Sequence, residues 1–172
     1  MWKSFVIAMI VCGVTFFVAT AAWASGANRI GIGVHYWTAV KDIDIKDVDQ
    51  SGLSWIGSYQ NQMAGFSTLE LDLEVFQEGY AGADAAVLSP QAYLLFGKAL
   101  YGGGGVGINY SDGSYSDPFF ALRAGLDLEV LPAVHVDINA NYRFETWNFE
   151  RVKENVKTGN VTLGAVVRLG LW

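Results

Sequence analysis

The sequence predicts an all-β protein: an eight-stranded antiparallel up-and-down transmembrane β-barrel that follows a cleaved N-terminal signal peptide. Three observations support this prediction. Apolar and polar residues alternate with a period of two through most of the chain after Ser25, which indicates strands. Long and short gaps alternate between these segments along the chain, as long loops and short turns do in an up-and-down barrel. The polar face of these segments carries charges of both signs, which suits a narrow polar interior.

Length and composition narrow the class of protein further. The chain has 172 residues, of which 52% are hydrophobic and 16% charged, with a formal net charge of −6. That length suits one domain, and the hydrophobic fraction excludes a disordered chain. The acidic balance excludes a basic nucleic-acid surface, so no nucleic-acid partner is expected. The single cysteine, Cys12, lies near the N-terminus, which leaves the rest of the chain without disulfides or thiolates.

The first element is a predicted signal peptide at residues 1–24, and residues 25–172 then form the barrel domain. Lys3 supplies a positive charge ahead of an apolar run over residues 5–19. Ala22-Trp23-Ala24 has the small residues of a cleavage site. The alternative is a retained membrane helix over residues 5–24, which is about long enough to span a bilayer.

The strands follow in order along the rest of the chain. Five segments alternate clearly, and two weaker strands are joined by a tight turn near Lys98. An eighth strand, at residues 53–62, has the weakest pattern. The predicted strands are 29–40, 53–62, 69–75, 87–97, 100–110, 120–129, 134–145 and 161–171. The long gaps are 42–52, 77–86, 111–117 and 148–159, and the short gaps are 61–65, 98–99 and 130–133. Four long loops at one end and three short turns at the other place both chain ends on the short-turn side.

Alternation alone does not decide whether the apolar face or the polar face of the sheet points out of the barrel. A secreted soluble barrel that binds a small ligand alternates with the same period of two. Strands of about 10 residues match a tilted transmembrane strand. Charges of both signs can pair inside a narrow lumen. Aromatic residues also gather towards strand ends, as in the interfacial girdles of membrane barrels. These aromatics are Tyr36, Trp55, Tyr59, Phe66, Phe76, Tyr101, Tyr110, Phe120, Tyr142, Phe144 and Trp147.

The signal segment, the eight alternating strands, a Gly-rich hairpin strand at residues 101–110 and the aromatic C-terminal Trp172 together resemble a known group. They look like the small outer-membrane β-barrel proteins of Gram-negative bacteria, the OmpA-like, OmpX-like and OmpW-like domains. The resemblance implies a location in the cell outer membrane, with the long loops outside the cell. It also implies that outer-membrane lipid and the barrel-assembly machinery are partners, whereas the external partner stays unknown. Trp172 departs from the group's pattern, because Leu169 and Leu171 have the opposite parity.

Charged and polar residues on the inward face are interpreted as a structural network, because buried ions must be paired. The candidate members are Glu70, Asp72, Glu74, Arg123, Asp127, His135, Asp137, Arg143, Glu145 and Arg168. An eight-stranded barrel is just wide enough for side chains to fill it.

One loop suggests a cation site. Asp47, Asp49 and Ser51 match the start of a calcium loop, but Ser58 stands where a bidentate Glu would close it. The alternative is a solvated acidic loop. Calcium is therefore a possible ligand, and no other cofactor is expected.

No catalytic residue is predicted. His35 and His135 are the only histidines, and acyl transfer would need one of them beside a serine and a carboxylate. The sequence favours a structural or interaction role, with the outer loops facing the exterior. The alternatives are a narrow conduit for small or apolar solutes, as in OmpW-like proteins, a lipid-modifying enzyme, and a secreted ligand-binding barrel.

Overall fold

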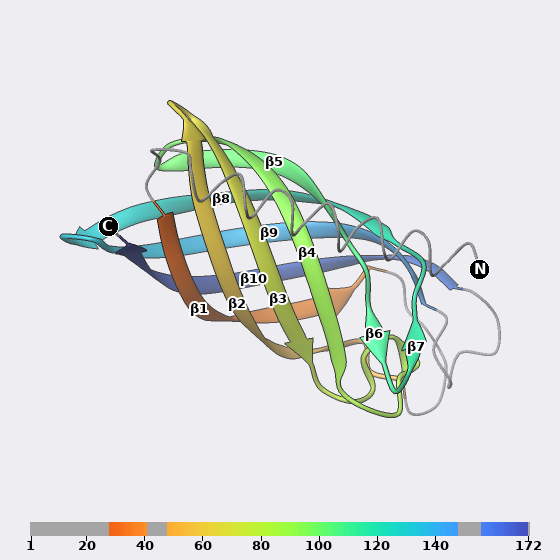
Figure 1. The fold of residues 1–172 in the computed structure, drawn as a ribbon. Helices are drawn as coiled ribbons and strands as arrows, with labels where there is room; N and C mark the ends of the chain where they lie inside the picture. The colour runs from red at the N-terminus through yellow and green to blue at the C-terminus, as the bar shows by residue number, and fades with distance from the viewer. Residues whose placement is uncertain (1–27, 41–47, 148–155, 172) are drawn as a thin grey trace.

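The computed structural model describes residues 28–40, 48–147 and 156–171, and within them eight long antiparallel strands close into a barrel (Figure 1). These strands are β1 (Asn28–Ala39), β2 (Ser51–Ala64), β3 (Ser67–Phe76), β4 (Val87–Gly97), β5 (Leu100–Gly107), β8 (Phe119–Leu131), β9 (Val134–Trp147) and β10 (Val156–Leu171). A small hairpin, β6 (Tyr110–Ser111) and β7 (Ser114–Tyr115), and a 3-10 turn, η1 (Tyr80–Gly82), lie in the connections. None of the helical segments described is long and apolar enough to cross a bilayer.

The barrel closes between its first and last strands. β1 pairs with β10 from Asn28↔Leu171 to Ala39↔Asn160, and β3 pairs with β4 from Ser67↔Phe96 to Phe76↔Val87. Each long strand thus has two hydrogen-bonded neighbours. A closed sheet has no open edge, which is the condition for strands to exist in a solvent that cannot hydrogen-bond to the backbone.

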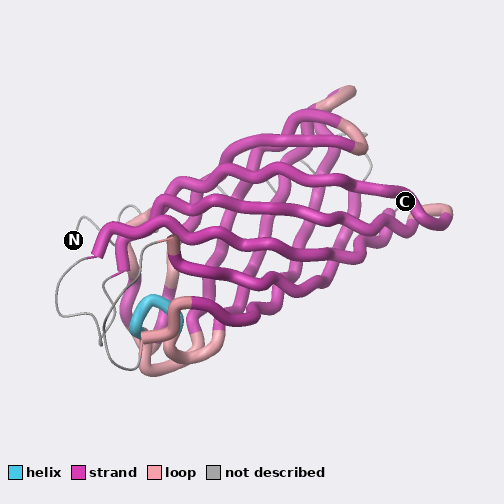
Figure 2. The backbone as a smooth tube through the Cα atoms, turned by 180° about the vertical axis from the view of Figure 1, so that it is seen from behind, coloured by secondary structure: helices cyan, strands magenta, loops and turns pink. Residues whose placement is uncertain are grey.

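The two ends of the barrel differ. Figure 2 shows the short turns at the end where the chain finishes, and the longer connections with η1 at the other end. The short turns join β2 to β3, β4 to β5 and β8 to β9. The predicted arrangement of short turns beside the chain ends is therefore correct.

The strands are apolar on the outside and polar on the inside. Along β1 and β10, Ile32 is 67% exposed and Leu163 is 56% exposed, whereas His35 and Arg168 are fully buried. A secreted soluble barrel would need the reverse arrangement. Large apolar side chains exposed around a barrel indicate a lipid-facing surface.

The structure corrects two aromatic assignments. Phe76 and Tyr101, predicted in the interfacial girdles, are buried in the lumen. The other aromatics of that set whose side chains are described lie on the outer face, as exposed or half-buried side chains.

Several strand boundaries also differ from the sequence prediction. β2 runs on to Ala64, with a bulge between Gln62 and Ala64, because its partner β3 continues the ladder to Ser67. β10 starts at Val156, inside a predicted loop, because β9 is long enough to pair with it. The predicted strand 100–110 ends at Gly107 and is followed by the β6–β7 hairpin.

Asp112 and Gly113 form the tip of that hairpin with φ of 41° and 81°. Two positive φ values at an Asp-Gly pair are typical of the tight turns that match strand twist. The predicted signal peptide at residues 1–24 and Trp172 lie outside the described residues.

The glycines of β5 make room for aromatic rings in the lumen. A Cβ at Gly105 would lie 2.4 Å from the Tyr93 ring, and one at Gly107 would lie 2.4 Å from the Phe119 ring. The Gly-rich strand is therefore a place of close packing beneath bulky neighbours.

If the outer face of the barrel contacts lipid, the stability cost of an arginine placed on it should depend on its depth in the bilayer. Leu163→Arg, in the middle of β10, should lower the free energy of unfolding in lipid vesicles by about 2–4 kcal/mol, since a cation at the bilayer midplane loses its hydration. Leu131→Arg, at the short-turn end of β8, should cost about 0–1 kcal/mol because it reaches the interface. Urea titration of both variants measures the difference. Equal costs would contradict a lipid-facing surface.

Candidate functional site

The lumen is organised around three acids of β3. Because side chains alternate along a strand, Glu70, Asp72 and Glu74 all point inward while the intervening leucines point outward. All three acids are buried. They form an acidic ladder that runs along the barrel axis, and such a ladder must be neutralised from the opposite wall.

The first two acids meet arginines from across the lumen. Arg123 of β8 donates Nη1 to Glu70 Oε1 at 2.5 Å and to Asp72 Oδ2 at 2.7 Å. Arg168 of β10 donates Nη2 to the same Glu70 oxygen at 2.9 Å, and its Nη1 pairs with Asp137 Oδ2 at 3.0 Å. The side chains of these ion pairs are fully buried. The pairs with Glu70 and Asp72 join β3 to β8 and β10, which are not its neighbours in the sheet, whereas Arg168–Asp137 joins the neighbouring strands β10 and β9.

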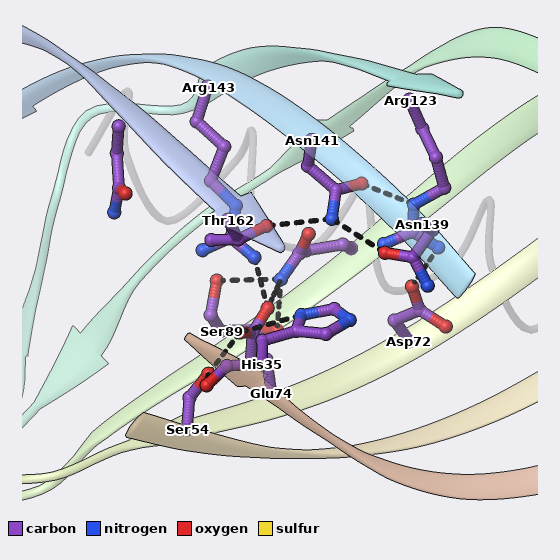
Figure 3. Close-up of polar contacts among 12 residues, drawn as sticks. His35, Ser54, Asp72, Glu74, Ser89, Arg123, Asn139, Asn141, Arg143 and Thr162 are labelled. Carbon is purple, nitrogen blue, oxygen red and sulfur yellow. Dashed lines mark hydrogen bonds and ion pairs between the residues drawn. The ribbon is translucent and has the colours of Figure 1, made fainter. Parts of the chain in front are cut away.

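The third acid, Glu74, gathers four partners. Arg143 of β9 contacts its Oε2, and Gln91 donates to the same oxygen at 3.1 Å. His35 Nδ1 lies 3.1 Å from Oε1, and the Ser54 hydroxyl donates to Oε1 at 2.5 Å. Figure 3 shows His35 and Ser54 converging on this carboxylate. We call the contacts of Arg123, Arg168 and Arg143 with the β3 acids the cross-lumen zipper.

Uncharged polar side chains complete the zipper. Asn141 receives a contact from Arg123 Nε and donates to Thr162 Oγ1 at 2.7 Å and to Asn139 Oδ1 at 3.1 Å. Asn139 in turn donates to Asp137 at 2.6 Å. The sequence prediction omitted these amides and hydroxyls, although their inward parity was visible in it. Charge alone was an incomplete guide, because buried carboxylates and guanidinium groups also need neutral partners.

Residues 79–83, which we call the plug, place Tyr80 in the lumen near its long-loop end. Its Tyr80 is fully buried, stacks on Phe76 with ring centroids 3.8 Å apart, and meets Trp37 edge-on at 4.8 Å. The Tyr80 hydroxyl donates to Glu145 Oε2 at 2.6 Å and accepts from Asn160 at 2.9 Å. Burial and the Glu145 carboxylate raise the pKa of the Tyr80 phenol well above its ordinary value, so it stays a donor.

At the short-turn end the charged groups form a separate cluster. Arg29 Nη1 donates to Asp127 Oδ2 at 2.5 Å, and His135 Nδ1 lies 3.0 Å from Asp127 Oδ1. Arg29 was not among the residues predicted from sequence. It is the first inward side chain of β1 and reaches Asp127 on β8.

The structure places all ten predicted network residues on the lumen. Nine are buried, and Asp127 is partly buried. The zipper uses six of them, Glu145 bonds to Tyr80 of the plug, and Asp137 pairs with Arg168. Asp127 and His135 belong to the cluster at the short turns. Buried side chains from all eight long strands thus occupy the lumen.

The calcium prediction is only partly covered. Asp47 lies outside the described residues, whereas Asp49 and Ser51 are exposed. Among the residues described, no three or more His, Cys, Asp and Glu side chains are grouped so as to hold a metal ion. A calcium loop at Asp47, Asp49 and Ser51 therefore stays a prediction.

Both histidine rings contact carboxylates. His35 contacts Glu74 and His135 contacts Asp127, each through Nδ1. The Ser54 hydroxyl near His35 donates to Glu74 and, at 3.5 Å, to the His35 backbone carbonyl. In neither hydrogen bond does the Ser54 hydroxyl donate to a histidine ring nitrogen. Acyl transfer by a serine requires such a histidine base. This arrangement is that of a hydrogen-bonded interior network.

A closed antiparallel barrel with an apolar exterior and an ion-paired lumen defines a small eight-stranded membrane β-barrel protein. Solved structures share this fold. Neisserial surface protein A is 16% identical, covers 83% of this chain and 96% of its own, and superposes with a TM-score of 0.61. The outer membrane protein AlkL, solved in lipid bilayers, is 12% identical, covers 86% and 91%, and has a TM-score of 0.50.

No family model matches the sequence, and no curated protein matches it. The predicted resemblance to small outer-membrane barrels is thus confirmed at the level of the fold. What the chain does must be argued from its own side chains.

The buried ion pairs of the zipper predict that neutralising one of its acids destabilises the protein. Glu70→Gln should lower the free energy of unfolding by about 3–5 kcal/mol, because it leaves Arg123 and Arg168 buried beside a neutral amide. Glu129→Gln is the matched control, since Glu129 is exposed on β8 and should change stability by less than about 0.5 kcal/mol. Urea unfolding in vesicles compares them. A mild effect of Glu70→Gln would mean that Glu70 is not the acid on which the lumen depends.

Proposed function

We propose that this protein is an integral outer-membrane β-barrel with a structural or interaction role, inserted after removal of a signal peptide at residues 1–24. The observation that carries the proposal is the filled lumen inside an apolar exterior. Outer-membrane lipid would cover the exterior, and the barrel-assembly machinery would insert the chain. Because buried ion pairs cross the lumen, we expect partners to bind at the ends of the barrel, on its loops and turns.

The long-loop end is the surface proposed to face the cell exterior. Its described loops expose acidic side chains, namely Asp49, Glu78, Asp84, Asp112 and Asp117. The β6–β7 hairpin adds a pair of tyrosine rings, Tyr110 and Tyr115, with centroids 4.8 Å apart. Loops on a rigid scaffold are common binding elements, which supports an interaction role.

The lumen bears on the alternative of a narrow conduit. An uninterrupted interior cavity would favour passage of a solute, but the zipper and the plug stand in its way. Opening a path along the axis would separate buried ion pairs such as Arg143–Glu74, at a high cost in free energy. The structure therefore favours the structural or interaction role over conduction.

Membrane insertion is tested by fractionation and gel mobility. We expect the protein in the outer-membrane fraction, and we expect unboiled and boiled samples to migrate differently, because a closed barrel in lipid resists detergent until heated. Soluble protein in the periplasm or medium, with one mobility, would refute the proposal.

The orientation is tested with single cysteines, since removal of the signal segment removes Cys12. Ser114→Cys, exposed at the β6–β7 hairpin, should react with a membrane-impermeant maleimide on intact cells. Lys98→Cys, exposed at the β4–β5 turn, should react only after the cells are lysed. The reverse pattern would place the long loops inside the cell and would remove the proposed outward interaction surface.

A further inference from the structure

A cavity of about 430 Å³ opens at the short-turn end of the barrel, and neither the zipper nor the plug uses it. We call it the cup. Its volume falls within the range of sites that hold small organic molecules. The cup is lined among others by Arg29, Thr68, Leu95, Lys98, Tyr101 and His135.

The lining of the cup includes a buried tyrosine, Tyr101, and a glutamine tied to the zipper. Tyr101 is buried, and its hydroxyl lies over Gly125, where a Cβ would be 2.5 Å from the oxygen. Gln60, also in the lining, is held in place by a hydrogen bond from its Nε2 to Glu70 Oε2 at 2.5 Å. Through Gln60 the cup lies next to Glu70 of the zipper.

The hydrogen-bond donors of the cup favour an anion. Asp127 has both oxygens engaged, one by Arg29 at 2.5 Å and the other by His135 at 3.0 Å. The other acid, Glu129, is exposed and accepts from the Ala133 amide at 3.2 Å. Arg29 and the exposed Lys98 match these two acids in formal charge, but the remaining N–H groups of Arg29, the Lys98 ammonium and the Thr68 hydroxyl supply further donors. Charge-assisted hydrogen bonds to an anion are the strongest contacts that such donors make.

The wall of the cup also includes apolar groups. Leu95, Gly97, Ala99 and the Tyr101 ring lie in the lining beside the charged groups. A purely inorganic anion would leave this side without a partner. A short hydrocarbon body would cover it and remove apolar surface from water.

We propose that the cup binds a small organic carboxylate. The carboxylate lies against Arg29, Lys98 and His135, and the hydrocarbon body lies against Leu95 and the Tyr101 ring. This site goes beyond the proposed role of the long loops, because it is at the opposite end of the barrel.

The two histidines allow a direct test by NMR of the histidine rings in folded, micelle-bound protein. Sodium butyrate is the probe, and n-butylammonium chloride is the control of opposite charge and similar body. We expect butyrate to shift the His135 signal saturably, with a dissociation constant in the millimolar range, and butylammonium to leave it unmoved. The His35 signal should not change with either probe, because that ring is buried beside Glu74.

Two variants separate the site from general charge effects. Lys98→Gln should weaken butyrate binding about threefold, the effect of one exposed charge, whereas Glu129→Gln should not weaken it. The mobility of the unboiled sample confirms that each variant is folded. A folded protein whose His135 signal does not respond, responds equally to butylammonium, or binds unchanged after Lys98→Gln would overturn the proposal. Such a failure would leave the fractionation and cysteine-labelling results standing.

Discussion

The pairing of buried arginines with the acids of β3 is the interaction on which the rest of the structure depends. Glu70, Asp72 and Glu74 could not remain ionised in the lumen without cations from the opposite wall. Arg123, Arg143 and Arg168 reach across and meet them, so the barrel is held at a width that side chains can fill. Amide and hydroxyl groups, among them those of Gln60, Asn141 and Ser54, bond to further polar atoms of this network. The lumen is thus a polar core with the packing role that an apolar core has in a soluble protein.

The exterior follows from the same constraint. With the polar residues turned inward, the alternate positions of every long strand turn outward, and these are mostly apolar. A closed sheet satisfies its own backbone, so lipid can surround it. The two ends are then the places where the protein meets water. At the long-loop end the plug buries Tyr80 in the lumen, and at the short-turn end lies the cup.

Much of this was predictable from sequence. The period of two set the inward and outward faces, and the alternation of long and short gaps set the strand number. Boundaries were less predictable, because a strand continues for as long as its neighbour offers partners. Val156 joins β10 only because Trp147 of β9 lies opposite. Phe76 and Tyr101 resemble girdle residues in type and in their position near strand ends, but each has the inward parity of its strand and is buried in the lumen.

The sequence by itself determined the face of each side chain and the charges available to the lumen, because both depend on local spacing. The tertiary structure alone decided which charges meet. Arg123 and Glu70 are 53 residues apart in the chain, and Arg168 and Glu70 are 98 apart. Their contact depends on the register of every strand between them and on the closure of β1 against β10. The entry of Tyr80 into the lumen and the formation of the cup have the same origin, since no local pattern records which side chains a closed barrel brings together.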